Sequence, residues 1–172
     1  EVPLALHKQE LDKRILEYFN ISTEKDTNLN KWRKLKTQIA NIKESVTIAM
    51  VGKYTGLQES YKSLTEALEH AGIASNVSIN IKWVDSRKSN IVIDSLQDVD
   101  AIIVPGGFGN DGAKGKLAAI KYAREKDIPF LGICLGMQLA VIEFAENMSD
   151  IISPYAIELG EIKSGSQIIG LM

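Results

Sequence analysis

Residues 128–136 read Ile-Pro-Phe-Leu-Gly-Ile-Cys-Leu-Gly, and this stretch decides which fold the chain can adopt. Residues 128–133 form a short apolar run that predicts a strand, and residues 135–146 predict a helix. Cys134 lies between the two, with Gly132 two residues before it and Gly136 two residues after it. A turn this sharp strains the backbone of its central residue, and the flanking glycines remove the clash. The pattern predicts a G-x-C-x-G nucleophile elbow, in which the helix N-terminus favours the thiolate of Cys134.

The alternation of strands and helices extends back from this elbow to residue 46. Strands alternating with helices of ten or more residues predict an α/β fold, a flavodoxin-like parallel sheet with helices on both faces. In such a sheet the chemistry lies at the carboxyl ends of the strands, where the turns 52–58, 105–112 and 134–136 leave it. The expected strands are 46–51, 77–84, 101–104 and 128–133, and the expected helices are 59–70 (stopped by Gly72), 113–126 and 135–146.

The two ends of the chain differ from this central pattern. Residues 1–44 are charged and helical, with one amphipathic helix near residues 11–19 and a second that Asn28 or Asn30 caps. We interpret 1–44 as a helical linker that packs on the domain or on a partner, and 45–172 as the domain. Residues 155–171 are expected to form a β-hairpin that turns at 163–166.

The composition excludes several classes of protein. The 172 residues contain 20 Lys and Arg, 22 Asp and Glu, and one Cys, with a net charge of −2. This balance gives no electrostatic reason to expect a nucleic-acid partner, and no apolar run approaches the roughly 20 residues of a membrane span. One cysteine excludes an internal disulfide and a Cys-based metal cluster, and we expect no metal site. We expect a cytoplasmic protein.

Residues 107–112, Gly-Phe-Gly-Asn-Asp-Gly, satisfy the G-x-G-x-x-G pattern of dinucleotide-binding folds. That fold also needs an acidic residue about 20 positions later, at the end of the next strand. The next strand ends at Ile133 and Cys134, and Asp127 precedes it at the opposite edge of the sheet, so the dinucleotide interpretation fails. The turn either serves an oxyanion hole through its backbone N–H groups or merely requires glycine.

The segments 131–138 (Leu-Gly-Ile-Cys-Leu-Gly-Met-Gln) and 105–109 (Pro-Gly-Gly-Phe-Gly) resemble class I glutamine amidotransferases. Residues 51–54 (Val-Gly-Lys-Tyr), 61–63 and 66–68 are more specifically similar to the glutaminase domain of the CTP synthase family. The resemblance extends over about residues 1–148 and includes the N-terminal helices, which resemble the end of that family's synthetase domain.

The resemblance implies a reaction and a set of site residues. Such a domain hydrolyses L-glutamine without a cofactor, and the ammonia passes to a synthetase domain that uses ATP and Mg²⁺ to convert UTP to CTP. It implies Cys134 as the nucleophile, and the N–H groups of Gly107 and Leu135 as oxyanion donors. Residues implied to line the glutamine pocket are Gly107, Phe108, Leu135, Gly136, Met137 and Gln138. Lys53 and Tyr54 would face an ammonia exit or a domain interface, and the family suggests a homo-oligomer, a tetramer.

The sequence departs from the family pattern at the catalytic base. The family requires a His-x-Glu pair late in the domain, whereas this chain has only His7 and His70, and we expect neither to act on Cys134. Asp111 stands where the family usually has arginine. We therefore interpret the chain as part of something longer, holding half of a glutaminase site with negligible activity on its own.

Two alternative functions remain open. The chain could be a catalytically incomplete or regulatory fragment of the same family that acts as an assembly module. It could instead be a different hydrolase with a cysteine elbow, in which Glu59 serves as the base.

Overall fold

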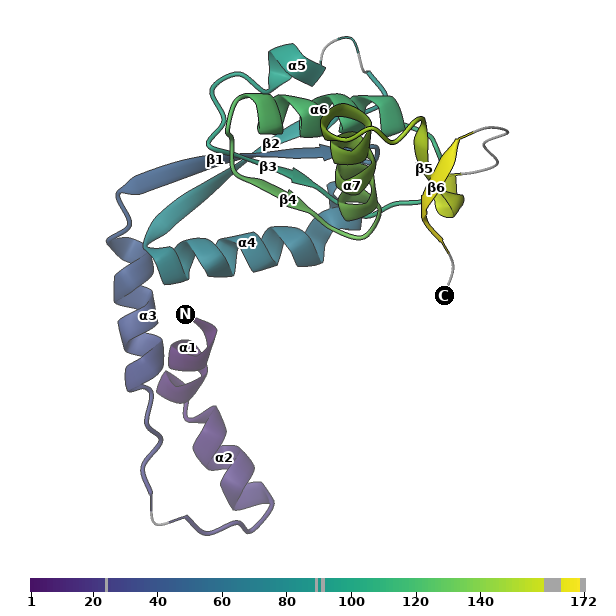
Figure 1. Cartoon of the computed structure of the whole chain (residues 1–172). Coiled ribbons are helices and arrows are strands. Elements are labelled where there is room, and N and C mark those ends of the chain that lie inside the picture. Colours follow the sequence, from purple (N-terminus) through teal and green to yellow (C-terminus); the bar gives the residue numbers. More distant parts are fainter. Residues whose placement is uncertain (24, 89, 91, 160–164, 171–172) are drawn as a thin grey trace. The chain divides into compact units, whose positions relative to one another are not determined.

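The computed structural model describes residues 1–172 except 24, 89, 91, 160–164 and 171–172 (Figure 1). Strands and helices alternate through the middle of the chain, as predicted. The helices are α1 (Val2–Lys8), α2 (Leu11–Tyr18), α3 (Asn30–Ala40), α4 (Lys62–Ser75), α5 (Val92–Ser95), α6 (Ala113–Glu125) and α7 (Leu135–Met148), with 3₁₀ helices at Gln58–Tyr61 and Ile157–Leu159. The strands are β1 (Glu44–Gly52), β2 (Val77–Asp85), β3 (Ala101–Val104), β4 (Phe130–Gly132), β5 (Pro154–Ala156) and β6 (Ser166–Ile169).

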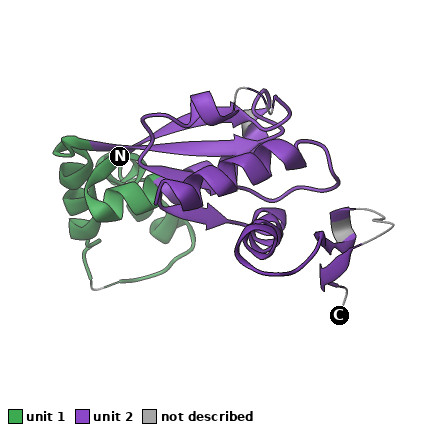
Figure 2. Cartoon of the chain, turned by 45° about the horizontal axis from the view of Figure 1, so that its top comes forward, with its two compact units in different colours: residues 1–44, 69–78 green, residues 45–68, 79–172 purple. Residues whose placement is uncertain are grey.

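The chain divides into two compact units, coloured green and purple in Figure 2. The first comprises residues 1–44 and 69–78, and the second comprises 45–68 and 79–172. In the first unit, Glu10 between α1 and α2 has a left-handed φ of 58°. Before α3, the Asn28 side chain accepts a hydrogen bond from the Asn30 backbone N–H at 3.0 Å. The N-cap of α3 is nevertheless Leu29, without a side-chain cap hydrogen bond, so the prediction that Asn28 or Asn30 caps this helix is wrong.

The second unit is built on a sheet with the strand order β2-β1-β3-β4. β1 pairs with β3 and β3 pairs with β4, both in parallel. Figure 1 shows α4 on one side of the sheet and α5 and α6 on the other. The predicted α/β class, with a flavodoxin-like parallel sheet covered on both faces, is confirmed. Because Val104 and Gly132 are paired across β3 and β4, the turns that follow these two strands leave the sheet side by side.

Both faces of this sheet are buried, which explains why its central strands read as continuous apolar runs. Successive side chains of a strand point to opposite faces. One face of the sheet packs with α6 and α7 and the other packs with α4. The first contains Ala49, Val51, Ile102 and Val104 with Ala119, Ala123, Leu139 and Ile142, and the second contains Ile48, Met50 and Ile103 with Leu64 and Leu68.

The structure corrects the predicted end of one helix. Gly72 does not stop the helix predicted for 59–70, because it lies buried inside α4, which runs from Lys62 to Ser75. Glycine in a helix interior costs only about 1 kcal/mol relative to alanine, which the remaining contacts of the helix can offset. The helix ends before Asn76, whose φ of 60° is the left-handed conformation common after a helix C-terminus.

The hairpin predicted for residues 155–171 is wrong. β5 and β6 pair in parallel, with Tyr155 opposite Gln167. A tight turn reverses chain direction and joins only antiparallel strands, whereas parallel neighbours need a connection that returns to the same end. That connection begins with the 3₁₀ helix Ile157–Leu159, and residues 163 and 164 of the predicted turn lie outside the described residues.

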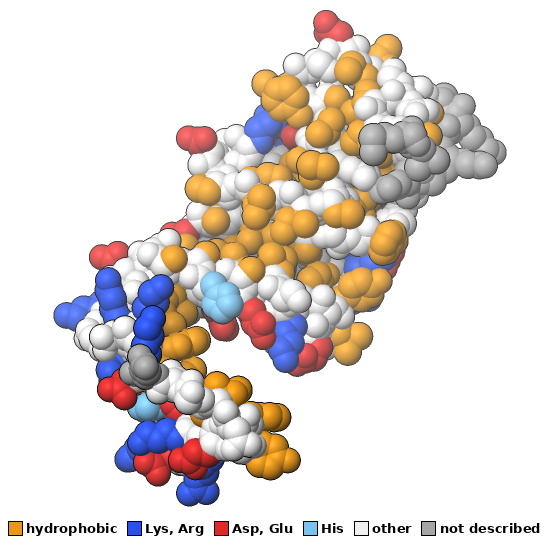
Figure 3. All heavy atoms as spheres, turned by 90° about the horizontal axis from the view of Figure 1, so that it is seen from below, with side chains coloured by type: hydrophobic (Ala, Val, Ile, Leu, Met, Phe, Trp, Pro, Cys, Tyr) orange, Lys and Arg blue, Asp and Glu red, His pale blue; other side chains and the backbone are white. Residues whose placement is uncertain are grey.

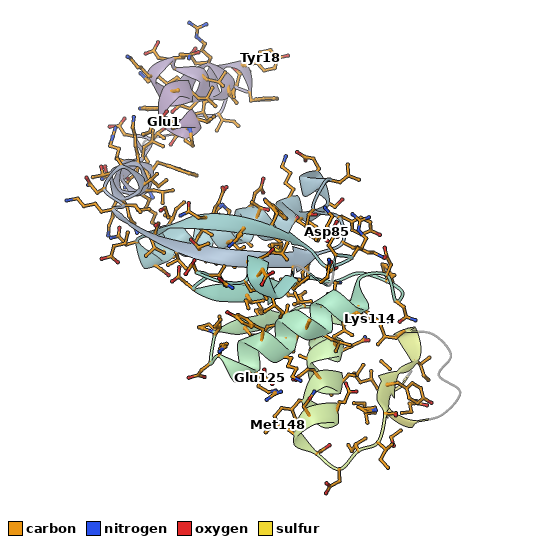
Figure 4. All side chains as sticks on the ribbon, turned by 90° about the horizontal axis from the view of Figure 1, so that it is seen from above. Glu1, Tyr18, Asp85, Lys114, Glu125 and Met148 are labelled. Carbon is orange, nitrogen blue, oxygen red and sulfur yellow. The ribbon has the colours of Figure 1, made fainter. Side chains whose placement is uncertain are left out.

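A partly buried ion pair joins α6 to α7, with the Arg124 side chain 27% exposed. Arg124 Nη2 donates to Glu143 Oε1 at 2.8 Å and Arg124 Nε donates to Glu143 Oε2 at 3.0 Å, while Glu143 is only 3% exposed. The hydrogen bonding of Arg124 to the Glu143 carboxylate raises the pKa of Arg124 above its usual value. In Figure 4 the labels Lys114 and Glu125 mark the two ends of α6, and Met148 marks the end of α7.

Replacing Arg124 with methionine is expected to lower the free energy of unfolding by about 3 kcal/mol, because the buried carboxylate of Glu143 loses its partner. Adding Glu143→Leu should restore most of this loss, and urea unfolding of the single and double variants measures both values. Lys121→Met is the control, since its exposed ion pair with Glu125 at 3.8 Å should contribute less than about 0.5 kcal/mol. A double variant no more stable than Arg124→Met would contradict the expectation.

Candidate functional site

Cys134 forms the turn between β4 and α7 and is exposed. Its backbone has φ 51° and ψ −113°, a region that residues other than glycine rarely adopt. The turn is closed by two backbone hydrogen bonds, from Gly136 N–H to Ile133 O at 2.9 Å and from Gln138 N–H to Cys134 O at 3.1 Å. The strained elbow conformation predicted from the G-x-C-x-G pattern is therefore present. Backbone strain of this kind persists only where the surrounding structure holds it in place.

The two glycines flanking Cys134 are required by close backbone approach. A Cβ atom at Gly132 would lie 2.7 Å from the backbone nitrogen of Met137. A Cβ atom at Gly136 would overlap the carbonyl oxygen of Val104, the last residue of β3. The elbow is thus pressed against the neighbouring strand, and no larger residue fits at either position without moving the backbone.

The glycine-rich turn after β3 lies directly beside Cys134. A Cβ atom at Gly106 would be 3.3 Å from the Cys134 Cβ and 3.8 Å from its Sγ. A Cβ atom at Gly107 would be 3.8 Å from the Leu135 side chain. The structure therefore brings together the two turns that carry the predicted residues Gly107, Cys134 and Leu135.

Backbone donors are available at this place. Leu135 is the first residue of α7, and N–H groups in the first turn of a helix have no acceptor within that helix. The dipole of α7 also places partial positive charge at this end. The site can therefore present a thiol and polar N–H groups to one carbonyl group, which is the arrangement that acyl transfer requires.

The predicted pocket residues are arranged unevenly. Gly136 is buried against Val104, whereas Phe108 is 87% exposed. Met137 lines an open apolar groove of about 550 Å³ together with residues further along α7, among them Val141 and Phe144. These described side chains do not by themselves form one closed pocket around Cys134.

Two lysines hold the backbone of the turn after β3. Lys53 Nζ donates to the carbonyl oxygen of Phe108 at 2.8 Å, and Lys116 Nζ donates to that of Pro105 at 3.4 Å. Lys116 is only 1% exposed. Its burial, and then repulsion from Lys53, lower the pKa of Lys116 below its usual value, whereas the nearby Cys134 acts in the opposite direction.

Sequence reasoning missed Lys116, although a signal for it was present. It lies on the same helical stripe as Ala113, Ile120 and Ala123, which face the sheet. A lysine in line with core positions of a helix predicts a buried ammonium, because residues three and four apart share one face.

Neither histidine is part of the site described above. His7 Nδ1 lies 2.7 Å from Asp12 Oδ2, and Thr27 Oγ1 donates to the same oxygen at 2.8 Å. The hydrogen bond with His7, and then that with Thr27, lower the pKa of Asp12 to about 2. His70 is exposed on α4. Both histidines belong to the first unit, whereas Cys134 belongs to the second.

Two further candidate residues are exposed. Glu59, the base of the alternative hydrolase, is exposed on the 3₁₀ helix Gln58–Tyr61, and Asp111 is exposed before α6. In the described part of the chain, no group of three or more His, Cys, Asp and Glu side chains could hold a metal ion. Among the same residues, no helix combines the length and apolar character needed to cross a membrane.

Comparison with known proteins adds the following findings. Residues 57–168 match the family model for glutamine amidotransferase class-I. The chain is 44% identical over its whole length to the CTP synthase of Azospirillum brasilense, and 43% identical over 99% of its length to that of Gluconobacter oxydans. It spans 32% of the length of each of these relatives. The solved glutaminase domain of Trypanosoma brucei CTPS with bound acivicin aligns with a TM-score of 0.61 and 40% identity, over 66% of this chain and 46% of that one.

Proposed function

This chain belongs to the glutamine amidotransferase class-I family, and from that premise we propose that it carries the nucleophile half of a glutaminase site in a CTP synthase. The observation that carries the proposal is Cys134, strained and exposed at the N-terminus of α7 and lying against the turn after β3. The thiolate of Cys134 attacks the side-chain amide carbon of glutamine, and the amide oxygen becomes an oxyanion. The N–H groups of Gly107 and Leu135 donate hydrogen bonds to that oxygen.

The tetrahedral intermediate then expels ammonia and leaves a thioester on Cys134, which water hydrolyses to release glutamate. The leaving nitrogen must take up a proton, and the attacking water must lose one. Because His7 is bound to Asp12 and His70 is exposed on α4, with neither in a contact with Cys134 or the turn after β3 among the described residues, we assign neither to this role. In our proposal the group that gives a proton to the leaving nitrogen and takes one from the attacking water comes from the part of the relatives' length that the chain does not span.

The ammonia is proposed to be used in converting UTP to CTP with ATP and Mg²⁺, in a synthetase domain that is likewise part of the relatives' remaining length. Support for this coupling comes from the relatives, which are named CTP synthase and match this chain over all or nearly all of its length. In our proposal the glutaminase steps use side-chain and backbone groups alone, without a cofactor.

A second candidate function, an assembly module, is favoured by exposed apolar side chains. In the first unit, Leu11, Ile15, Tyr18 and Phe19 on and just after α2 are between 40% and 81% exposed. Hydrophobic side chains also reach the molecular surface in the view of Figure 3. An apolar helix face of this kind is suited to packing against another protein surface, and this role is compatible with a glutaminase.

Labelling with a glutamine analogue tests the proposed function. In the full-length protein, acivicin, a chloro-isoxazole amino acid, is expected to modify Cys134, and excess glutamine is expected to slow the modification. Mass mapping of peptides identifies the modified residue, and Cys134→Ser is the matched control that should take up far less label. Modification elsewhere, or modification that glutamine does not slow, would contradict a glutamine site at Cys134.

A further inference from the structure

Lys116 is a buried charged side chain that the proposed glutaminase steps do not use. It lies on α6 among the buried residues Ala119, Ile120 and Ala123, with 1% of its surface exposed. A lysine is rarely buried to this extent unless its ammonium has a partner. Methionine fills nearly the same volume, so packing alone does not require an ammonium at this position.

The contacts of the Lys116 ammonium converge on the turn beside Cys134. Its Nζ donates to the carbonyl oxygen of Pro105 at 3.4 Å and lies 3.4 Å from the position that a Cβ atom would take on Gly107. At the other end of the same turn, Lys53 Nζ donates to the carbonyl oxygen of Phe108 at 2.8 Å. Two ammonium groups, one following β1 and one from α6, therefore hold the first and last carbonyls of the segment 105–108.

Holding the Pro105 carbonyl fixes the peptide plane that it shares with the Gly106 N–H, and holding the Phe108 carbonyl fixes the plane that it shares with the Gly109 N–H, because each peptide unit is planar. The Gly107 N–H belongs to a peptide unit between these two fixed planes, so its direction is restricted from both sides. A donor must point at the developing oxyanion to within a fraction of an ångström to stabilise it, and a rigid support provides this without reorganisation during the reaction. The positive charge of the Lys116 ammonium, in a buried position of low dielectric constant, additionally favours negative charge on the oxyanion of the tetrahedral intermediate.

We propose that Lys116 is a positioning residue of the oxyanion hole, whose buried ammonium holds the Pro105–Phe108 turn so that the Gly107 N–H points at the oxygen of the amide that Cys134 attacks. This inference rests on the proposed glutaminase function. It assigns to Lys116 an effect on the transition state, with little effect on the binding of glutamine itself.

The test replaces Lys116 with methionine in the full-length protein. The kcat for glutamine hydrolysis is expected to fall by about 10- to 100-fold, somewhat less than the about 10²- to 10³-fold that loss of an oxyanion donor itself causes. KM for glutamine should change less than about threefold. The dissociation constant of the γ-aldehyde analogue of glutamine, which forms a tetrahedral adduct with a thiol, should rise by the same factor as kcat falls.

Matched controls separate this role from a purely structural one. Lys114, labelled in Figure 4, is exposed two residues earlier on α6, and Lys114→Met should leave all of these constants unchanged. Lys116→Met should retain CTP formation from added ammonia and unfold at an equal or higher temperature, since it removes a buried charge. An unchanged kcat and aldehyde affinity in Lys116→Met would overturn the proposal, as would an equal loss of the ammonia-dependent rate with a lowered melting temperature.

A final measurement does not depend on glutaminase activity. Hydrogen exchange in the segment 105–110 is expected to speed up at least about tenfold in Lys116→Met and to stay unchanged in Lys114→Met. If the unsubstituted protein hydrolyses no glutamine, the proposed function fails, and this exchange measurement still decides whether Lys116 holds the turn. Unchanged exchange in Lys116→Met would overturn the inference by itself.

Discussion

Replacing Cys134 with alanine in the full-length protein is expected to reduce glutamine-dependent CTP formation at least about a thousandfold and to leave formation from added ammonia unchanged. The methyl group of alanine cannot attack an amide carbon, and Cys134 is the single cysteine among the 172 residues, so this chain holds no second thiol. Rates of CTP formation with each nitrogen source measure the effect. Glutamine-dependent synthesis at a substantial fraction of the original rate would contradict the assignment of Cys134 as nucleophile.

Cys134→Gly is the companion variant, because it also removes the thiol but relieves the backbone. At φ 51° and ψ −113° only glycine is unstrained, so this variant should be more stable than Cys134→Ala by about 1–3 kcal/mol. Urea unfolding compares the two. Equal inactivity with unequal stability would show that strain is retained at Cys134 for the sake of its thiol.

Replacing Gly136 with alanine is expected to lower the free energy of unfolding by more than about 4 kcal/mol, or to prevent folding. The new Cβ would overlap the carbonyl oxygen of Val104, which also accepts a hydrogen bond from Ile133 N–H at 3.0 Å. Neither backbone can retreat without breaking the contact between β3 and the start of α7. Urea unfolding, or the yield of folded protein where the variant is too unstable, measures the loss.

Gly56→Ala is the matched control for this prediction. An added Cβ atom at Gly56 meets nothing within 4 Å, and the stability should change by less than about 0.5 kcal/mol. A Gly136→Ala variant as stable as Gly56→Ala would show that β3 and α7 are less closely packed than the structure describes.

The strands and most helices could be predicted because their signals are local. The apolar runs at 46–51 and 101–104 are buried on both faces of the sheet, and the helix beginning at Leu135 follows directly from the elbow pattern. Two predictions failed where the folded structure overrode a local signal. Gly72 stays inside α4, and β6 pairs with β5 in parallel, although the sequence between them suggested a turn.

For the candidate site, the sequence by itself determined the elbow around Cys134, because a G-x-C-x-G turn between strand and helix depends on neighbours along the chain. Only the tertiary structure decided which residues lie beside this elbow. Gly106 meets Cys134 because β3 and β4 pair in register, and Lys116 reaches Pro105 because α6 packs on that same sheet. These contacts join residues that lie eleven or more positions apart, and their geometry depends on packing that no local pattern encodes.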